Sequence, residues 1–70
     1  MTAAEITGTT RLFGVIADPI DHVRACEVFN PRFRDRGIDA VLVPFHVRPA
    51  DLTAALRGFR AFPNLGGVLV

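Results

Sequence analysis

The side chains most able to do chemistry lie between Asp18 and Arg24, directly after a short apolar run. Asp18 and Asp21 are carboxylates three residues apart, so one could act as an acid and the other as a base. The same residues are typical of a turn and of a helix start, where Asx hydrogen bonds and the helix dipole favour them. His22 is either a polar anchor for a ligand or a residue that caps and packs the loop. The sequence leaves both pairs of interpretations open.

Arg24 is the one permanent cation of this stretch, and its planar fork of donors suits a carboxylate. The alternative is a solvent-facing arginine on the first turn of a helix, which is the usual place for this residue. Outside the stretch, His46 is expected at the exposed end of a strand, and Cys26 has no base beside it. In the first predicted helix, Arg32, Arg34 and Arg36 do not form one stripe, which indicates a solvated face. In the second, Arg57 and Arg60 share a polar face that is expected to be solvated.

Length and composition describe a small domain that is marginal by itself. Seventy residues bury only about 60% of their unfolded surface. The single cysteine excludes an intrachain disulfide, and no Cys/His cluster suggests a structural zinc. Half of the residues are nevertheless apolar. This mismatch predicts a piece of a larger domain, in which other residues cover the apolar faces. All eight basic residues are arginine, so a catalytic lysine cannot lie within the chain.

The charge pattern argues against nucleic-acid and membrane partners, because the net charge is only +1. No apolar stretch approaches the length of a membrane helix, and the first residues lack the features of a signal peptide. A single thiol and no export signal predict a cytoplasmic protein. Residues 1–10 are small, polar and aperiodic, which predicts a flexible leader ahead of one domain at 11–70.

The pattern of apolar residues predicts three strands. Residues 11–17 are apolar on both alternating sets, which is typical of a strand inside a parallel sheet with helices on each side. Pro19 lies just beyond the end of this strand. Residues 39–47 form the second strand, and Pro44 favours the edge of the sheet. The third strand is expected at 67–70.

The first predicted helix begins near Val23 or Arg24. Pro31 removes a backbone donor, so the helix should kink or restart there, with Asn30 as the cap of the new turn. Gly37 is a good stop at the end of the helix.

A second helix is expected to begin after Asp51, which is placed as its N-cap. Its apolar positions recur at the helical spacing i, i+3, i+4 and i+7 and predict an amphipathic helix: Leu52, Ala55, Leu56 and Phe59.

The order of elements is therefore β-α-β-α-β. Short connections and right-handed crossovers predict a three-layer α/β/α arrangement of parallel strands in the order 2-1-3. Ligands of such open sheets bind at the carboxyl ends of the strands, beside the central one. This places the stretch from Asp18 to Ala25 at the mouth of a site.

The segment from Gly14 to His22 resembles a motif of the shikimate dehydrogenases. That motif reads Gly-x-Pro-Ile-x-His-Ser-x-Ser-Pro and is followed by a His-Asn pair. Pro19, Ile20, His22 and Asn30 match it. The spacing to the second strand, second helix and Gly-rich third strand is also similar.

The resemblance covers residues 11–70 and identifies them as part of an N-terminal substrate-binding domain, divergent and truncated. It implies a parent oxidoreductase of aromatic amino acid biosynthesis that uses NADP or NAD. The parent would move a hydride to or from a shikimate- or quinate-like cyclic hydroxy acid. The family's lysine, in a Thr-x-Pro-x-Lys segment, would fall beyond Val70, so the chain alone is expected to be inactive. Gly66-Gly67 lacks a dinucleotide fingerprint, so we expect no cofactor bound here. A homodimeric parent is left open.

Two departures from the motif concern the substrate. The resemblance implies that two serine hydroxyls bind the substrate carboxylate, and Val23 and Ala25 stand in their places. Neither side chain can donate a hydrogen bond. The hypothesis is a reshaped pocket lined by His22, Val23, Arg24 and Ala25. In one interpretation Arg24 replaces the lost hydroxyls, and in the other, which is the usual case for an arginine, it faces solvent.

The alternative is a non-catalytic small α/β binding or interaction module that kept the scaffold and lost the serines. A lysine shortly after Val70, followed by a Gly-rich strand-to-helix turn, would favour the enzyme. A response-regulator-like unit would need clustered acidic residues after the first strand, where only Asp18 stands.

Overall fold

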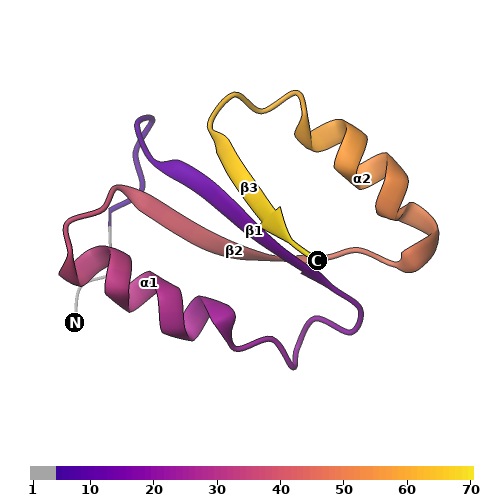
Figure 1. The fold of residues 1–70 in the computed structure, drawn as a ribbon, viewed down its shortest axis with the longest axis horizontal. Helices are drawn as coiled ribbons and strands as arrows, with labels where there is room; N and C mark the ends of the chain where they lie inside the picture. Colours follow the sequence, from indigo (N-terminus) through magenta and orange to yellow (C-terminus); the bar gives the residue numbers. More distant parts are fainter. Residues whose placement is uncertain (1–4) are drawn as a thin grey trace.

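The chain was analysed as a computed structural model, which describes residues 5–70. Strands and helices alternate along it (Figure 1). The elements are β1 (Arg11–Ala17), α1 (Ala25–Asp35), β2 (Ala40–His46), a short 3₁₀ turn η1 (Pro49–Asp51), α2 (Leu52–Phe59) and β3 (Leu65–Leu69).

The three strands form one parallel sheet in the order β2-β1-β3. β1 lies in the middle and pairs with β2 over its whole length, from Arg11 opposite Ala40 to Ala17 opposite His46. Its pairing with β3 has an irregularity between Leu12 and Phe13. The parallel sheet, its strand order and the edge position of β2 are confirmed. β3 begins two residues earlier than expected, at Leu65, because Leu65 still pairs with Leu12.

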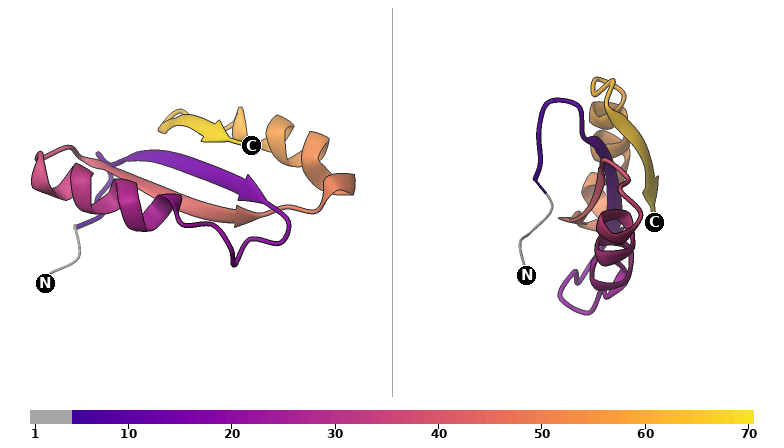
Figure 2. Two further views of the ribbon diagram at one scale, coloured as in Figure 1. Left: turned by 60° about the horizontal axis from the view of Figure 1, so that its bottom comes forward. Right: turned by 90° about the vertical axis from the view of Figure 1, so that its left-hand side faces the viewer.

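The helices reach opposite faces of the sheet through aromatic side chains. Phe33 of α1 lies 6.2 Å from Phe13, measured between ring centroids. Phe59 of α2 lies 5.1 Å from Phe45, which is paired with Ile16. Phe13 and Ile16 are three residues apart in β1 and therefore face opposite sides. The molecule is thin, with extents of 37 × 28 × 14 Å, because each helix lies toward one edge of the sheet (Figure 2).

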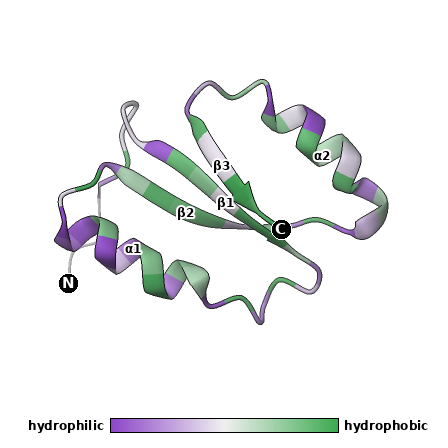
Figure 3. Ribbon diagram, viewed as in Figure 1, coloured by the Kyte–Doolittle hydropathy of each residue, from purple (hydrophilic) through white to green (hydrophobic). Residues whose placement is uncertain are grey.

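The hydrophobic colouring follows the strands (Figure 3), and the buried core lies in β1 and β2. Its apolar members are Val15, Ile16, Ala40 and Leu42. Outside this core, large apolar side chains are exposed to solvent, with Phe29 43% and Leu69 54% exposed. Incomplete burial of this kind is what the apolar composition predicts for so short a chain. Between residues 5 and 70, no helix is long and apolar enough to cross a membrane.

α1 continues through Pro31 without a second start, so the expected restart is wrong. Asn30 does not cap a new turn, because its side chain bonds to the edge strand. Its Nδ2 donates to the carbonyl of Leu42 at 3.0 Å, and its Oδ1 accepts the Leu42 N–H at 2.8 Å. These bonds and the packing of Phe33 hold the helix on both sides of the proline, which itself removes one backbone donor.

Gly37 ends α1, as expected. Its φ of +67° is the left-handed conformation that glycine adopts without strain. The Gly37 N–H donates to Arg34 O at 3.2 Å, and the Ile38 N–H donates to Phe33 O at 2.8 Å. This pair of bonds is a Schellman motif.

Asp51 occupies the N-cap position of α2, but its side chain makes no capping bond. The expected N-cap position is therefore confirmed, without a capping bond from the side chain. The 3₁₀ turn leads directly into α2, and its Pro49 carbonyl already accepts the N–H of Leu52, the first residue of the helix.

Of the predicted leader at 1–10, residues 1–4 lie outside the described part. In the rest, Thr10 is buried, and its Oγ1 donates to Asp39 Oδ1 at 2.7 Å. Thr9 Oγ1 donates to Asp39 Oδ2 at 2.5 Å. The boundary between leader and domain stays a prediction. The hydroxyls of Thr9 and Thr10 hold the pKa of Asp39 below its ordinary value of 3.8.

Asp39 should make the fold acid-sensitive. Because its folded pKa is lowered, its contribution is fully present above pH 3.8 and is lost as the pH falls through the lower folded value. We expect Asp39→Asn to flatten the decline of the urea midpoint between about pH 5 and about pH 2. Asp35→Asn, at an acidic residue without a hydroxyl donor in the structure, is the control. An equal flattening in both variants would contradict this prediction.

Gly14 permits a close approach inside the sheet. A Cβ at this position would overlap the ring of Phe45, and that ring is held by Phe59. Gly14→Ala should therefore lower the free energy of unfolding by about 1–3 kcal/mol, through overpacking. Gly67→Ala is the matched control, since a Cβ there meets open space. Urea unfolding checks both variants, and equal stability of the two would exclude the overlap as a constraint.

Candidate functional site

The candidate site is the edge of the sheet where β1 and β2 end. Ala17 and His46 are the last residues of the two strands and lie opposite each other. The Val47 N–H donates to Ala17 O at 3.4 Å, which extends the pairing by one bond. The segment 18–24 leaves this edge and leads into α1. It is the place where ligands bind in open α/β sheets.

Asp18 and His46 form the polar pair at this edge. His46 Nε2 lies 2.8 Å from Asp18 Oδ1, and the two side chains are 51% and 35% exposed. Sequence reasoning considered both residues but did not connect them. The signal was there, because a parallel pairing with these strand ends brings residues 18 and 46 together.

Asp21 and His22 lie further along the loop and do not join that pair. Their closest approach to each other is 3.8 Å, between Asp21 Oδ1 and His22 Nε2, and both side chains are largely exposed. The Val23 N–H donates to Ile20 O at 3.1 Å and closes a turn over residues 20–23, which contains both side chains. The structure therefore does not bring Asp18 and Asp21 together as an acid and a base.

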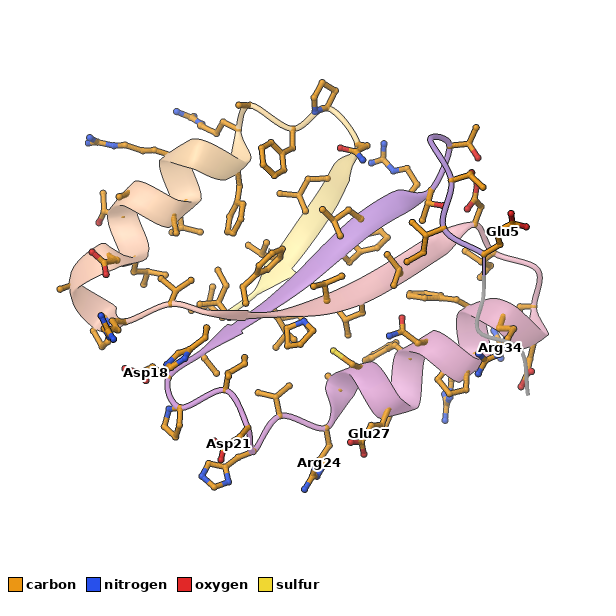
Figure 4. The ribbon with its side chains drawn as sticks, turned by 180° about the vertical axis from the view of Figure 1, so that it is seen from behind. Glu5, Asp18, Asp21, Arg24, Glu27 and Arg34 are labelled. Atoms are coloured by element: carbon orange, nitrogen blue, oxygen red, sulfur yellow. The ribbon has the colours of Figure 1, made fainter. Side chains whose placement is uncertain are left out.

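Arg24 stands at the N-cap of α1 and binds an acidic neighbour. Its Nη1 lies 3.2 Å from Glu27 Oε1, and both side chains are about two-thirds exposed. Figure 4 shows Asp21, Arg24 and Glu27 along the rim below the sheet, with Arg24 pointing away from it. Val23 and Ala25 are half-buried beside it. In this arrangement the guanidinium is engaged by Glu27.

Cys26, on the first turn of α1, is half-buried. Burial raises the pKa of the Cys26 thiol, and the charge of Glu27 acts in the same direction. The thiol is therefore protonated at neutral pH, which is unsuited to a nucleophile.

Among residues 5–70, three hollows adjoin the sheet, one of which lies at the opposite edge beside Thr10 and Ala40. A second, of about 270 Å³, lies between α1 and β3 and is almost entirely apolar. Its lining is Phe13, Gly14, Phe29, Phe33, Leu42, Gly67, Val68 and Leu69. The third, of about 660 Å³, lies beyond the end of β2 and is lined by His46, Val47, Arg48, Asp51, Ala54 and Ala55. This third hollow has polar side chains in its lining and shares His46 with the candidate site.

The described residues do not fit a resident metal or dinucleotide. Residues 5–70 contain no group of three His, Cys, Asp or Glu side chains that could hold an ion. Gly66 and Gly67 lie inside β3, whereas a dinucleotide needs a Gly-rich turn between a strand and a helix.

Comparison with known proteins gives one consistent relationship. The chain is 36% identical over 61 residues to the shikimate dehydrogenase (NADP(+)) of Crocosphaera subtropica, a match that covers 87% of this chain and 21% of that protein. The shikimate dehydrogenase of Listeria monocytogenes, solved with shikimate and NAD, superposes with a TM-score of 0.79. It is 35% identical, and the match covers 96% of this chain and 24% of that one.

A second solved shikimate dehydrogenase, in complex with NADP+, has a TM-score of 0.85 and 29% identity. That match covers 97% of this chain and 24% of the solved one. No protein-family model matches. The chain is homologous to shikimate dehydrogenase over most of its length, in the region of the N-terminal substrate-binding domain. It spans about a fifth of the length of the curated relatives that it matches.

Proposed function

We propose that this chain is part of the substrate-binding side of a shikimate dehydrogenase-like enzyme. The parent would transfer a hydride between NADP, or NAD, and a shikimate- or quinate-like cyclic hydroxy acid, in the cytoplasm. The observation that carries the proposal is the match to the Listeria protein, which was solved with shikimate and NAD. The chain would contribute the loop that leaves the central strand, and the hydride-transfer chemistry would belong to other residues.

The placement of the loop supports this role. Residues 18–24 follow the carboxyl end of β1, between the ends of the two paired strands and the start of α1. The side chains proposed to line the pocket, His22, Val23, Arg24 and Ala25, are consecutive along this loop and the first residue of the helix. Arg24 and His22 are the polar groups among them, so the carboxylate of the acid would be recognised by these two.

A specific observation keeps the second candidate, a non-catalytic binding module, in view. The side chains of Val23 and Ala25 carry no hydrogen-bond donor, and the Arg24 guanidinium is paired with the Glu27 carboxylate. A module that binds another ligand would need neither serine.

The first test is a titration of the ¹⁵N-labelled 70-residue chain with shikimate. We expect the amide signals of residues 20–25 to shift, with a Kd on the order of 1 mM, because only part of a pocket is present. Benzoate, which has the carboxylate but no hydroxyls, is the control ligand. Shifts that are absent, or the same with benzoate, would remove the proposal and favour the binding module.

Arg24 should carry much of the affinity in that titration. Replacing it by Ala removes a charge-assisted hydrogen bond to the carboxylate, which is worth a loss of about tenfold in affinity. Glu27→Gln is the matched variant, since it releases Arg24 from its partner and should bind shikimate at least as tightly as the wild type. An unchanged Kd for Arg24→Ala would assign Arg24 to the solvent-facing role.

A further inference from the structure

Within residues 5–70, the loop of residues 18–24 has one side-chain hydrogen bond to the sheet. Its other polar contacts among the described residues are local: the turn from Ile20 to Val23, the approach of Asp21 to His22, and the bond from Arg24 into α1. Among the described residues, Asp18 makes the side-chain hydrogen bond from this loop to another strand. Its partner is His46, the last residue of β2.

We propose that His46 is a positioning residue, which holds Asp18 and through it the substrate-binding loop. The loop-fixing role stands on the geometry alone, and the consequence for substrate rests on the proposed function. The motif from Gly14 to His22 does not include His46, which lies 24 residues after His22 at the end of β2. The motif alone therefore does not reveal this role.

The chemistry of the pair defines what His46 must supply. Asp18 Oδ1 accepts a hydrogen bond, so His46 Nε2 must carry a proton. Both the imidazolium and the neutral tautomer protonated at Nε2 satisfy this requirement. A glutamine amide reaches a similar position and also donates, whereas alanine offers nothing. His46→Gln is thus the conservative variant and His46→Ala the disruptive one.

The pair should act on the loop and not on the fold. Both side chains are substantially exposed, and exposed pairs of this kind contribute little to global stability. The sheet pairing between β1 and β2 is made by backbone groups and does not depend on the pair. Loss of the imidazole should therefore loosen residues 19–24 and leave the melting temperature nearly unchanged.

The experiment measures ¹⁵N backbone order parameters and shikimate affinity on the 70-residue chain and three variants. In His46→Ala, the order parameters of residues 20–24 should fall clearly below the value of about 0.85 that is typical of rigid backbone. The Kd for shikimate should rise about two- to fivefold. His46→Gln should restore both. Arg48→Ala, which removes the other long polar side chain at this strand end, should leave both unchanged.

The possible outcomes separate the positioning role of His46 from the proposed function. Unchanged loop order in His46→Ala, or an equal change in Arg48→Ala, overturns the positioning role. A loosened loop with an unchanged shikimate Kd supports the loop-fixing role and overturns its consequence for substrate binding. If the wild-type chain binds no shikimate, the proposed function fails, and the order parameters alone decide whether His46 holds the loop.

Discussion

Both faces of the central strand β1 must be apolar and must allow aromatic side chains to pack closely against them. The rest of the structure depends on this constraint. It is the strand with a partner on each side, and its residues 14–16 are buried. One face receives Phe33 from α1, and the other receives the ring of Phe45, which fits only because residue 14 has no side chain. The two ends of β1 mark the two edges of the sheet. At the amino edge Asp39 accepts hydrogen bonds from two threonine hydroxyls, and at the carboxyl edge the loop begins.

The elements that hydrophobic periodicity specifies could be predicted from the sequence. A strand apolar on both faces and a short α/β alternation are enough for the parallel sheet and the order β2-β1-β3. The error at Pro31 came where tertiary contacts override local preference. Pro31 is tolerated because Asn30 and Phe33 fix the helix to the sheet. These contacts join residues far apart in the chain and cannot be read from neighbouring residues.

The candidate site was predictable in position, and its internal contacts were predictable only where helical spacing or the strand register indicates them. The rule that ligands bind at the carboxyl ends of strands located the loop, and the resemblance to shikimate dehydrogenases was confirmed by homologues that share both sequence and fold. Pairing Asp18 with His46 requires the strand register, which depends on residues far apart in the chain. Arg24 finds Glu27 three residues later, a contact that helical spacing would have indicated.

The two outer edges of the sheet differ because of Asn30. A free edge strand presents unpaired N–H and C=O groups that invite another strand to add. On β2, the amide of Asn30 occupies both outward groups of Leu42, and α1 lies along the same edge. Within the described residues, β3 pairs only with β1 and has no such cover. Growth of this sheet is thereby directional: a further strand, from whatever polypeptide supplies it, can join beside β3 but is blocked beside β2.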